Sequence, residues 1–219
     1  MLVRDRMSKT VVLVNSKTTI LEAEKLMKEK GIRRLPVVDG GKIVGIVTYN
    51  DLLEAEPSKA ISLSRFEITY LLSKMTVAEI MKKRVITIKP DTPIEEAALI
   101  MKKNNVGGMP VVQESQVIGV ITESDIFGVL VETLGVEEGG TRITLELPMK
   151  AGVLYEVTSV IKNHQVNILS LATFHNPERA NYRYIVIRVD SSNPDALLDD
   201  LTAKGFPIKH VWITPKEQG

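Results

Sequence analysis

The sequence predicts a protein of mixed α+β and α/β structure, in which two tandem β-α-β-β-α repeats precede a βαββαβ domain. The first observation behind this prediction is an internal duplication. Residues 45–51 (GIVTYND) recur as residues 119–125 (GVITESD), and the offset of 74 positions (119 − 45) holds without gaps over roughly fifty residues. The second observation is a change of pattern after residue 140, where alternating strands replace the repeated segment.

The composition is that of a soluble globular protein, with 44% hydrophobic and 25% charged residues among 219. A net charge of +1 gives no electrostatic reason to expect a nucleic-acid or anionic-membrane partner. The chain has no cysteine, which excludes disulfides, thiolate metal sites and a cysteine nucleophile. No run reaches the ~18 apolar residues of a membrane span, and the N-terminus lacks the apolar core of a signal peptide. We therefore expect a cytoplasmic protein.

Each repeat opens with a β-branched run, Val11–Val14 or Val85–Ile88, which we interpret as a buried strand. A helix follows, because apolar residues recur at the spacing i, i+3, i+7 that forms one face. The residues of these faces are Ile20, Ala23 and Met27 in the first repeat and Ile94, Ala97 and Met101 in the second. Gly31 and its counterpart Asn105 suit the left-handed position that ends a helix.

Two short strands and a second helix complete each repeat. The turn at Asp39–Gly41 between apolar runs indicates a hairpin, and the turn at Gln113–Ser115 is its counterpart. Asp51 and Asp125 begin the second helices. Pro57-Ser58 ends the first of them, and an amphipathic connector precedes the second repeat.

The C-terminal part predicts a ferredoxin-like βαββαβ order, since four strand patterns alternate with two helical ones. The expected domains are a first repeat at 1–56, a helical connector at 57–74, a second repeat at 75–134, a linker at 135–140 and the C-terminal domain at 141–219.

The duplicated segment resembles a cystathionine-β-synthase (CBS) domain pair, or Bateman module, over about residues 1–130. The two Gly-x-x-Thr-x-x-Asp stretches and the two Pro-Val-Val strands carry this resemblance. Residues 141–214 resemble an ACT domain through residues 147–154 (LPMKAGVL) and 166–168 (VNI). A CBS pair followed by an ACT domain resembles the bacterial acetoin-utilisation family AcuB.

In CBS pairs this motif binds adenosine nucleotides. The resemblance implies that Thr48 and Thr122 meet phosphate and that Asp51 and Asp125 meet ribose. The chemistry fits, since a carboxylate can accept both ribose hydroxyls and a helix N-terminus favours phosphate. The alternative is that each Thr and Asp only caps its helix.

The resemblance also places Arg33-Arg34 in the central cleft against phosphates, where the second repeat has Gly107-Gly108. The alternative for the arginines is a solvated pair at a helix end. Thr87 and Ile88 would line the site of Asp51, because the opening strand of one repeat serves the other repeat's site. We expect the two sites to differ, with the Asp51 site binding phosphate more tightly.

In ACT domains small ligands bind near the loop after the first strand, which here points to Gly152, Val153 and Leu154. The alternative is a glycine that only starts a helix, in a domain that serves assembly.

No catalytic or metal site is expected, since none of His164, His175 and His210 has metal-ligand spacing and no nucleophile elbow or Walker loop occurs. We expect a regulatory sensor of adenosine nucleotides, AMP, ADP or ATP, that forms a homodimer, and the residues leave S-adenosylmethionine open as the ligand. Its link to acetoin catabolism rests on the family alone. The second hypothesis is a scaffold that regulates a partner protein without binding nucleotide, and the third is a hydrolase or transferase.

Overall fold

The computed structural model describes residues 1–55 and 64–215. The chain divides into two compact units, Met1–Ile126 and Phe127–Gly219, and the boundary lies inside the helix α7 (Glu123–Thr133). The elements of the first unit, with α7 at its end, are α1 (Val3–Arg6), α2 (Ile20–Lys30), β1 (Arg34–Asp39), β2 (Lys42–Thr48), α3 (Tyr49–Ala55), α4 (Arg65–Leu72), α5 (Val77–Ile80), α6 (Ile94–Asn104), β3 (Gly108–Gln113), β4 (Gln116–Thr122) and α7 (Glu123–Thr133).

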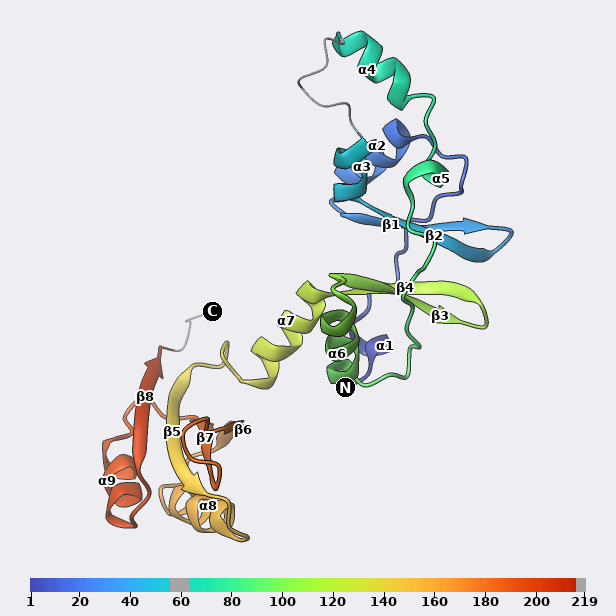
Figure 1. Ribbon diagram of the computed structural model, residues 1–219. Helices are drawn as coiled ribbons and strands as arrows, with labels where there is room; N and C mark the ends of the chain where they lie inside the picture. The colour runs from blue at the N-terminus through green and yellow to red at the C-terminus, as the bar shows by residue number, and fades with distance from the viewer. Residues whose placement is uncertain (56–63, 216–219) are drawn as a thin grey trace. The chain divides into compact units, whose positions relative to one another are not determined.

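The first unit repeats one motif twice, a helix followed by an antiparallel hairpin and a second helix (Figure 1). The predicted apolar faces of α2 and α6 are confirmed, since all six of their residues are buried. Gly31 and Asn105 end these helices with φ of 63° and 51°, as expected for left-handed caps. The two predicted hairpins are confirmed as β1–β2 and β3–β4.

The opening runs of the repeats are not strands, contrary to the sequence prediction. Each contributes a single parallel bridge, Val14 to Val37 in the first repeat and Ile88 to Val111 in the second. The bridge uses the carbonyl of Pro36 and the amide of Val38. Extending this ladder toward the start of the run would require an amide hydrogen on Pro36, which proline lacks, and Pro110 has the same effect in the second repeat.

The two repeats exchange their leading segments. The segment around α1 bonds to the second repeat, with the Ser8 amide 2.9 Å from the Val120 carbonyl oxygen. The segment around α5 bonds to the first repeat, with the Lys82 amide 2.9 Å from the Ile46 carbonyl oxygen. Val3 of α1 and Val77 of α5 are fully buried. Each repeat therefore completes its fold with a segment that precedes the other repeat.

The predicted connector lies partly within the described residues, as α4. Leu72 at its end is buried, whereas Phe66, Tyr70 and Leu71 are exposed. The expected helix break at Pro57-Ser58 lies outside the described residues. No helix in the described part of the chain is long and apolar enough to cross a membrane.

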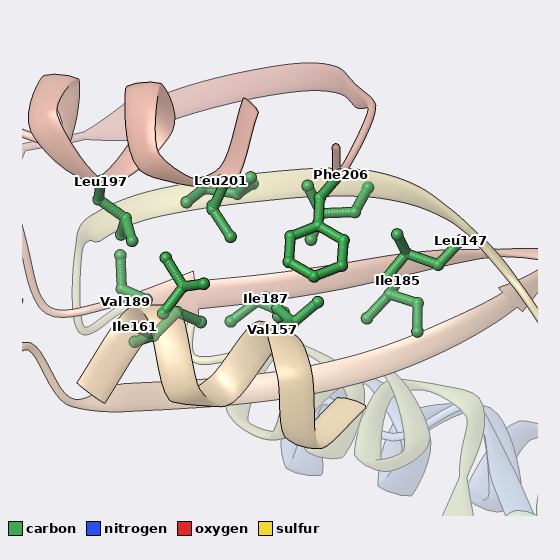
Figure 2. Packing of buried hydrophobic residues seen from close by; sticks show 12 residues of the cluster. Leu147, Val157, Ile161, Ile185, Ile187, Val189, Leu197, Leu201 and Phe206 are labelled. Atoms are coloured by element: carbon green, nitrogen blue, oxygen red, sulfur yellow. The ribbon is translucent and has the colours of Figure 1, made fainter. Parts of the chain in front are cut away.

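The second unit has the predicted βαββαβ order, with its four antiparallel strands arranged β6-β7-β5-β8. Its elements are β5 (Gly140–Pro148), α8 (Val153–Asn163), β6 (Ile168–His175), β7 (Tyr182–Val189), α9 (Asp195–Ala203) and β8 (Ile208–Thr214). Figure 2 shows its core, in which Val157 and Ile161 of α8 and Leu197 and Leu201 of α9 meet side chains from the sheet, such as Ile187. Alternate residues of β5 and β7 supply that layer, as expected for a sheet with one covered face.

Candidate functional site

The first motif forms a reciprocal cap at the start of α3. The Asp51 Oδ2 atom accepts hydrogen bonds from the Thr48 amide at 2.7 Å and from the Thr48 hydroxyl at 2.6 Å. The Asp51 amide in turn donates to the Thr48 hydroxyl at 3.4 Å. The chain thus folds the motif into a helix cap, with the Asp51 side chain only 7% exposed behind Thr48.

The second motif has the same cap, with Asp125 Oδ2 2.7 Å from both the amide and the hydroxyl of Thr122. The two motifs differ in what contacts the other carboxylate oxygen, Oδ1. Asp51 Oδ1 forms an ion pair at 3.1 Å with the ammonium group of Lys82, which precedes the opening run of the other repeat. The residue that corresponds to Lys82 at the second motif is Ser8, at the 74-residue offset, and it brings no charge.

Ionisation of Asp51 is favoured by this environment. Burial opposes the charged form, but the hydrogen bonds from Thr48 and the ion pair with Lys82 outweigh it. As a result, the pKa of Asp51 lies below its ordinary value. The carboxylate is therefore charged at neutral pH.

A cleft of about 550 Å³ lies beside the first motif, and we call it the first-motif cleft. The wall formed by the first repeat includes Thr48, Tyr49 and Asn50. The facing wall comes from the second repeat and includes Lys82 and a run at Arg84–Ile86. The complete lining is Arg33, Arg34, Ile46, Thr48, Tyr49, Asn50, Lys82, Arg84, Val85, Ile86, Asn105, Val106, Gly107 and Gly108.

A cleft of about 420 Å³ beside the second motif has the reverse construction, and we call it the second-motif cleft. Thr122, Glu123 and Ser124 face Ser8 and Thr10–Val12 of the first repeat. The complete lining is Ser8, Thr10, Val11, Val12, Gly31, Ile32, Arg33, Arg34, Pro36, Gly107, Val120, Thr122, Glu123 and Ser124. Its volume, like that of the first-motif cleft, lies within the ~300–1,000 Å³ typical of small-molecule sites.

The predicted arginines and glycines meet between the two clefts. Arg33 and Arg34 line both, as does Gly107. The Arg34 guanidinium donates to the Gly107 carbonyl oxygen, and it occupies the space beside Gly108 where a side chain would begin. Burial lowers the pKa of Arg34, while the nearby carboxylates of Glu123 and Asp125 oppose that shift. The glycines of the second repeat thus make room for an arginine of the first.

Four predicted residues do not line the clefts. Asp51 and Asp125 are held in the helix caps by Thr48 and Thr122, and neither is among the residues that line a cleft. Thr87 is exposed and Ile88 is 5% exposed in the core, and neither lines the first-motif cleft. The opening run does supply the facing wall, but through Val85 and Ile86, because Ile88 is held by its bridge to Val111.

Sequence reasoning missed two cations, Lys82 and Arg84, that line the first-motif cleft. The signal that could have found them is the duplication itself. Residues 82–84 (KKR) align with residues 8–10 (SKT), so a charge difference between the sites was visible at that offset. Because both clefts share the arginines, Lys82 and Arg84 are what distinguish the first-motif cleft.

The predicted ligand residues of the second unit lie at the start of α8. Gly152 is exposed and has φ of 87°, so its left-handed backbone explains the glycine without a ligand. Val153 packs against the core of the unit, and Leu154 is exposed.

A charged cluster lies elsewhere in the second unit, around Glu146 of β5. Its carboxylate is 2.8 Å from the Lys209 ammonium, 2.7 Å from the Asn176 amide nitrogen and 3.6 Å from the Arg179 guanidinium. The hydrogen bond from Lys209 is the largest of the effects that lower the pKa of Glu146. Glu146 is 5% exposed, so these partners compensate a buried charge.

Comparisons with known proteins match both units. The CBS domain family matches residues 3–58 and 77–132, and the TTHA0829-like ACT domain family matches residues 139–211. A CBS domain-containing protein of Dictyostelium discoideum is 37% identical over 135 residues, which are 61% of this chain and 93% of that protein. An L-aspartate semialdehyde sulfurtransferase of Methanocaldococcus jannaschii is 37% identical over 57% of this chain, but the match spans only 22% of that enzyme.

Solved structures match the CBS pair. The CBS domain pair of protein MJ0100, in complex with 5′-methylthioadenosine and S-adenosyl-L-methionine, is 35% identical with a TM-score of 0.50, over 59% of this chain and 95% of that one. A Vibrio cholerae protein assigned to acetoin utilization (AcuB) is 29% identical with a TM-score of 0.52, over 63% of this chain and 96% of that one.

Proposed function

The chain belongs to the CBS-domain family, with a CBS pair followed by a TTHA0829-like ACT domain, and we propose that it is a regulatory sensor that binds adenosine nucleotides in its two clefts. CBS pairs of this family are regulatory modules. We assign it no enzymatic activity from relatives that are named as enzymes, because the match to the sulfurtransferase covers only 22% of that enzyme.

One observation carries the proposal: each cleft joins the start of the Thr-x-x-Asp motif of one repeat, Thr48–Asn50 or Thr122–Ser124, to the opening run of the other, around a shared arginine pair. An adenosine nucleotide offers matching groups. Its ribose hydroxyls can donate to the Asp51 or Asp125 carboxylate, and its phosphate can accept from Arg33 or Arg34. The apolar residues Val85 and Ile86, or Val11 and Val12 in the other cleft, offer a surface for a flat base.

The ligand class is supported by the MJ0100 pair, which is 35% identical and holds two adenosine compounds. We propose AMP, ADP or ATP for this chain because of its arginine pair. A ligand bound at a cleft made from both repeats would change how the repeats hold each other, and the ACT domain would pass that state to a partner protein. The AcuB similarity supports a link to acetoin catabolism within this proposal.

The test is calorimetric titration of the full chain with AMP and with 2′-deoxy-AMP. Loss of a hydrogen bond to a charged partner costs about 1.5–3 kcal/mol, so the deoxy compound should bind at least tenfold more weakly. Equal affinities would remove the ribose role of Asp51 and Asp125. Absence of heat with either compound, together with an unchanged melting temperature, would overturn nucleotide sensing.

A scaffold function is the second candidate, and the caps favour it. Thr48 and Asp51 satisfy each other, as do Thr122 and Asp125, so both motifs have a structural role without a ligand. Under this hypothesis a pull-down partner would bind equally well with and without AMP.

A further inference from the structure

The two clefts share one construction but differ in how much positive charge lines them. The first-motif cleft is lined by four cationic side chains, Arg33, Arg34, Lys82 and Arg84, with no acidic residue in its lining. The second-motif cleft shares the two arginines but adds Glu123, and it has Ser8 and Thr10 where the other has Lys82 and Arg84. The first-motif cleft therefore attracts anionic ligands more strongly.

Lys82 and Ser8 occupy equivalent backbone positions. The Lys82 amide and carbonyl bond to Ile46 at 2.9 and 3.1 Å, and those of Ser8 bond to Val120 at 2.9 and 3.0 Å. The backbone thus delivers each side chain to the opposite repeat in the same way. Only the side chain differs, and only the lysine reaches a carboxylate, Asp51 Oδ1.

We propose that Lys82 is a specificity-determining residue that restricts the first-motif cleft to phosphorylated adenosine compounds, an inference that rests on the proposed nucleotide-sensing function. Oδ2 of Asp51 is already engaged by Thr48, and Oδ1 is engaged by Lys82. A ribose that binds Asp51 through both hydroxyls must therefore displace the ammonium group.

The consequence of that displacement depends on the ligand. An uncharged nucleoside leaves the ammonium without a counter-charge, in a cleft that already holds three arginines. A phosphate group supplies the counter-charge, so Lys82 exchanges a carboxylate for a phosphate and loses little. Since Lys82 is 66% exposed, its side chain has room to move between the two partners. At the second motif no such exchange is needed, and Asp125 admits an uncharged adenosine compound directly.

The experiment compares AMP and adenosine by calorimetric titration of the full chain. Three variants accompany the natural protein: Lys82→Ser, which copies the second site; Ser8→Lys, which copies the first; and Lys83→Ser, the matched charge control. Lys83 is exposed, adjacent to Lys82, and lines neither cleft. For the natural protein we expect two AMP sites but a single adenosine site.

We expect Lys82→Ser to create a second adenosine site and to weaken AMP at the first-motif cleft by about tenfold, the effect of one charge-assisted hydrogen bond. Ser8→Lys should abolish the natural adenosine site while AMP still binds, and Lys83→Ser should change neither ligand. If Lys82→Ser weakens both ligands equally, or changes neither, the role of Lys82 is refuted while nucleotide sensing stands. If the natural protein binds neither compound, both proposals fail.

Discussion

The contact between Arg34 and Gly108 predicts that Gly108→Ala is destabilising even though a strand tolerates alanine. A Cβ atom at Gly108 would overlap the Arg34 guanidinium, 2.7 Å from its Cζ atom, and would lie 2.8 Å from the Ile121 carbonyl oxygen. The guanidinium can swing away, but it then loses its hydrogen bond to the Gly107 carbonyl. The Ile121 carbonyl belongs to the β3–β4 ladder and yields less easily.

The magnitude follows from these contacts. Overpacking of this kind costs about 1–3 kcal/mol, against which alanine recovers about 0.4–1 kcal/mol by restricting the unfolded chain. The net loss is about 1–2 kcal/mol, or a melting temperature lower by roughly 3–8 °C for a unit of this size. Gly107→Ala is the matched control, because its nearest neighbours are the flexible ends of Glu123 and Arg34 at 3.1 and 3.2 Å.

Scanning calorimetry is the suitable assay for this prediction. The chain has one tryptophan, Trp212, and it lies in the second unit, so its fluorescence would not report directly on Gly108. In an Arg34→Ala background, Gly108→Ala should cost less than in the natural protein, because the overlap with the guanidinium is gone and only the contact with the Ile121 carbonyl remains. Equal costs in the two backgrounds would show that the arginine does not fill the space beside Gly108, and the reasoning would fail.

Three further predictions concern the cores, the charged cluster and assembly. Met101→Ala should lower stability by about 2–5 kcal/mol, measured by calorimetry, because the side chain is buried in the first unit. The pKa of Glu146 is lowered in the folded state, so its ionised carboxylate contributes stability that is fully present above the ordinary glutamate pKa and is lost as pH falls through the folded pKa. Glu146→Gln should therefore lower the urea concentration at the unfolding midpoint at pH 7, followed by Trp212 fluorescence. The difference from the natural protein should shrink below pH ~4. The exposed apolar side chains Phe66 and Phe127 support a homodimer, and a monomeric mass by light scattering at micromolar concentration would contradict it.

The fold was largely predictable because the duplication allowed each pattern to be checked against its copy. The spacing of Ile20, Ala23 and Met27 and its repetition fixed the buried faces of two helices. The opening runs have the composition of strands without being strands, because β-branched residues indicate burial and an extended backbone but not pairing. Pro36, one residue before the bridge to Val37, was the signal that a ladder could not extend there.

The site was less predictable, because its charges come from residues far apart in the sequence. The sequence placed Arg33 and Arg34 in the central cleft but left open which motif they serve, and in the structure they line both clefts. The Arg34 side chain reaches Gly107 because of how the two repeats pack, and the local sequence pattern carries no information about that packing. Lys82 contacts Asp51 only because the leading segments of the repeats are exchanged.

The exchanged segments around α1 and α5 also govern the order in which the chain can fold as it is synthesised. Val3 is fully buried, and its amide donates to the carbonyl oxygen of Thr92, far along the chain. The Ser8 amide cannot form its hydrogen bond until Val120 has been synthesised. The first repeat is likewise incomplete until Val77 has emerged. Contacts of such sequence separation slow folding, so the N-terminal arm stays unpaired on the ribosome until almost the whole of the first unit has been made. A chain truncated before β4 would lack Val120, the backbone partner of Ser8, and would leave that end of the arm unpaired.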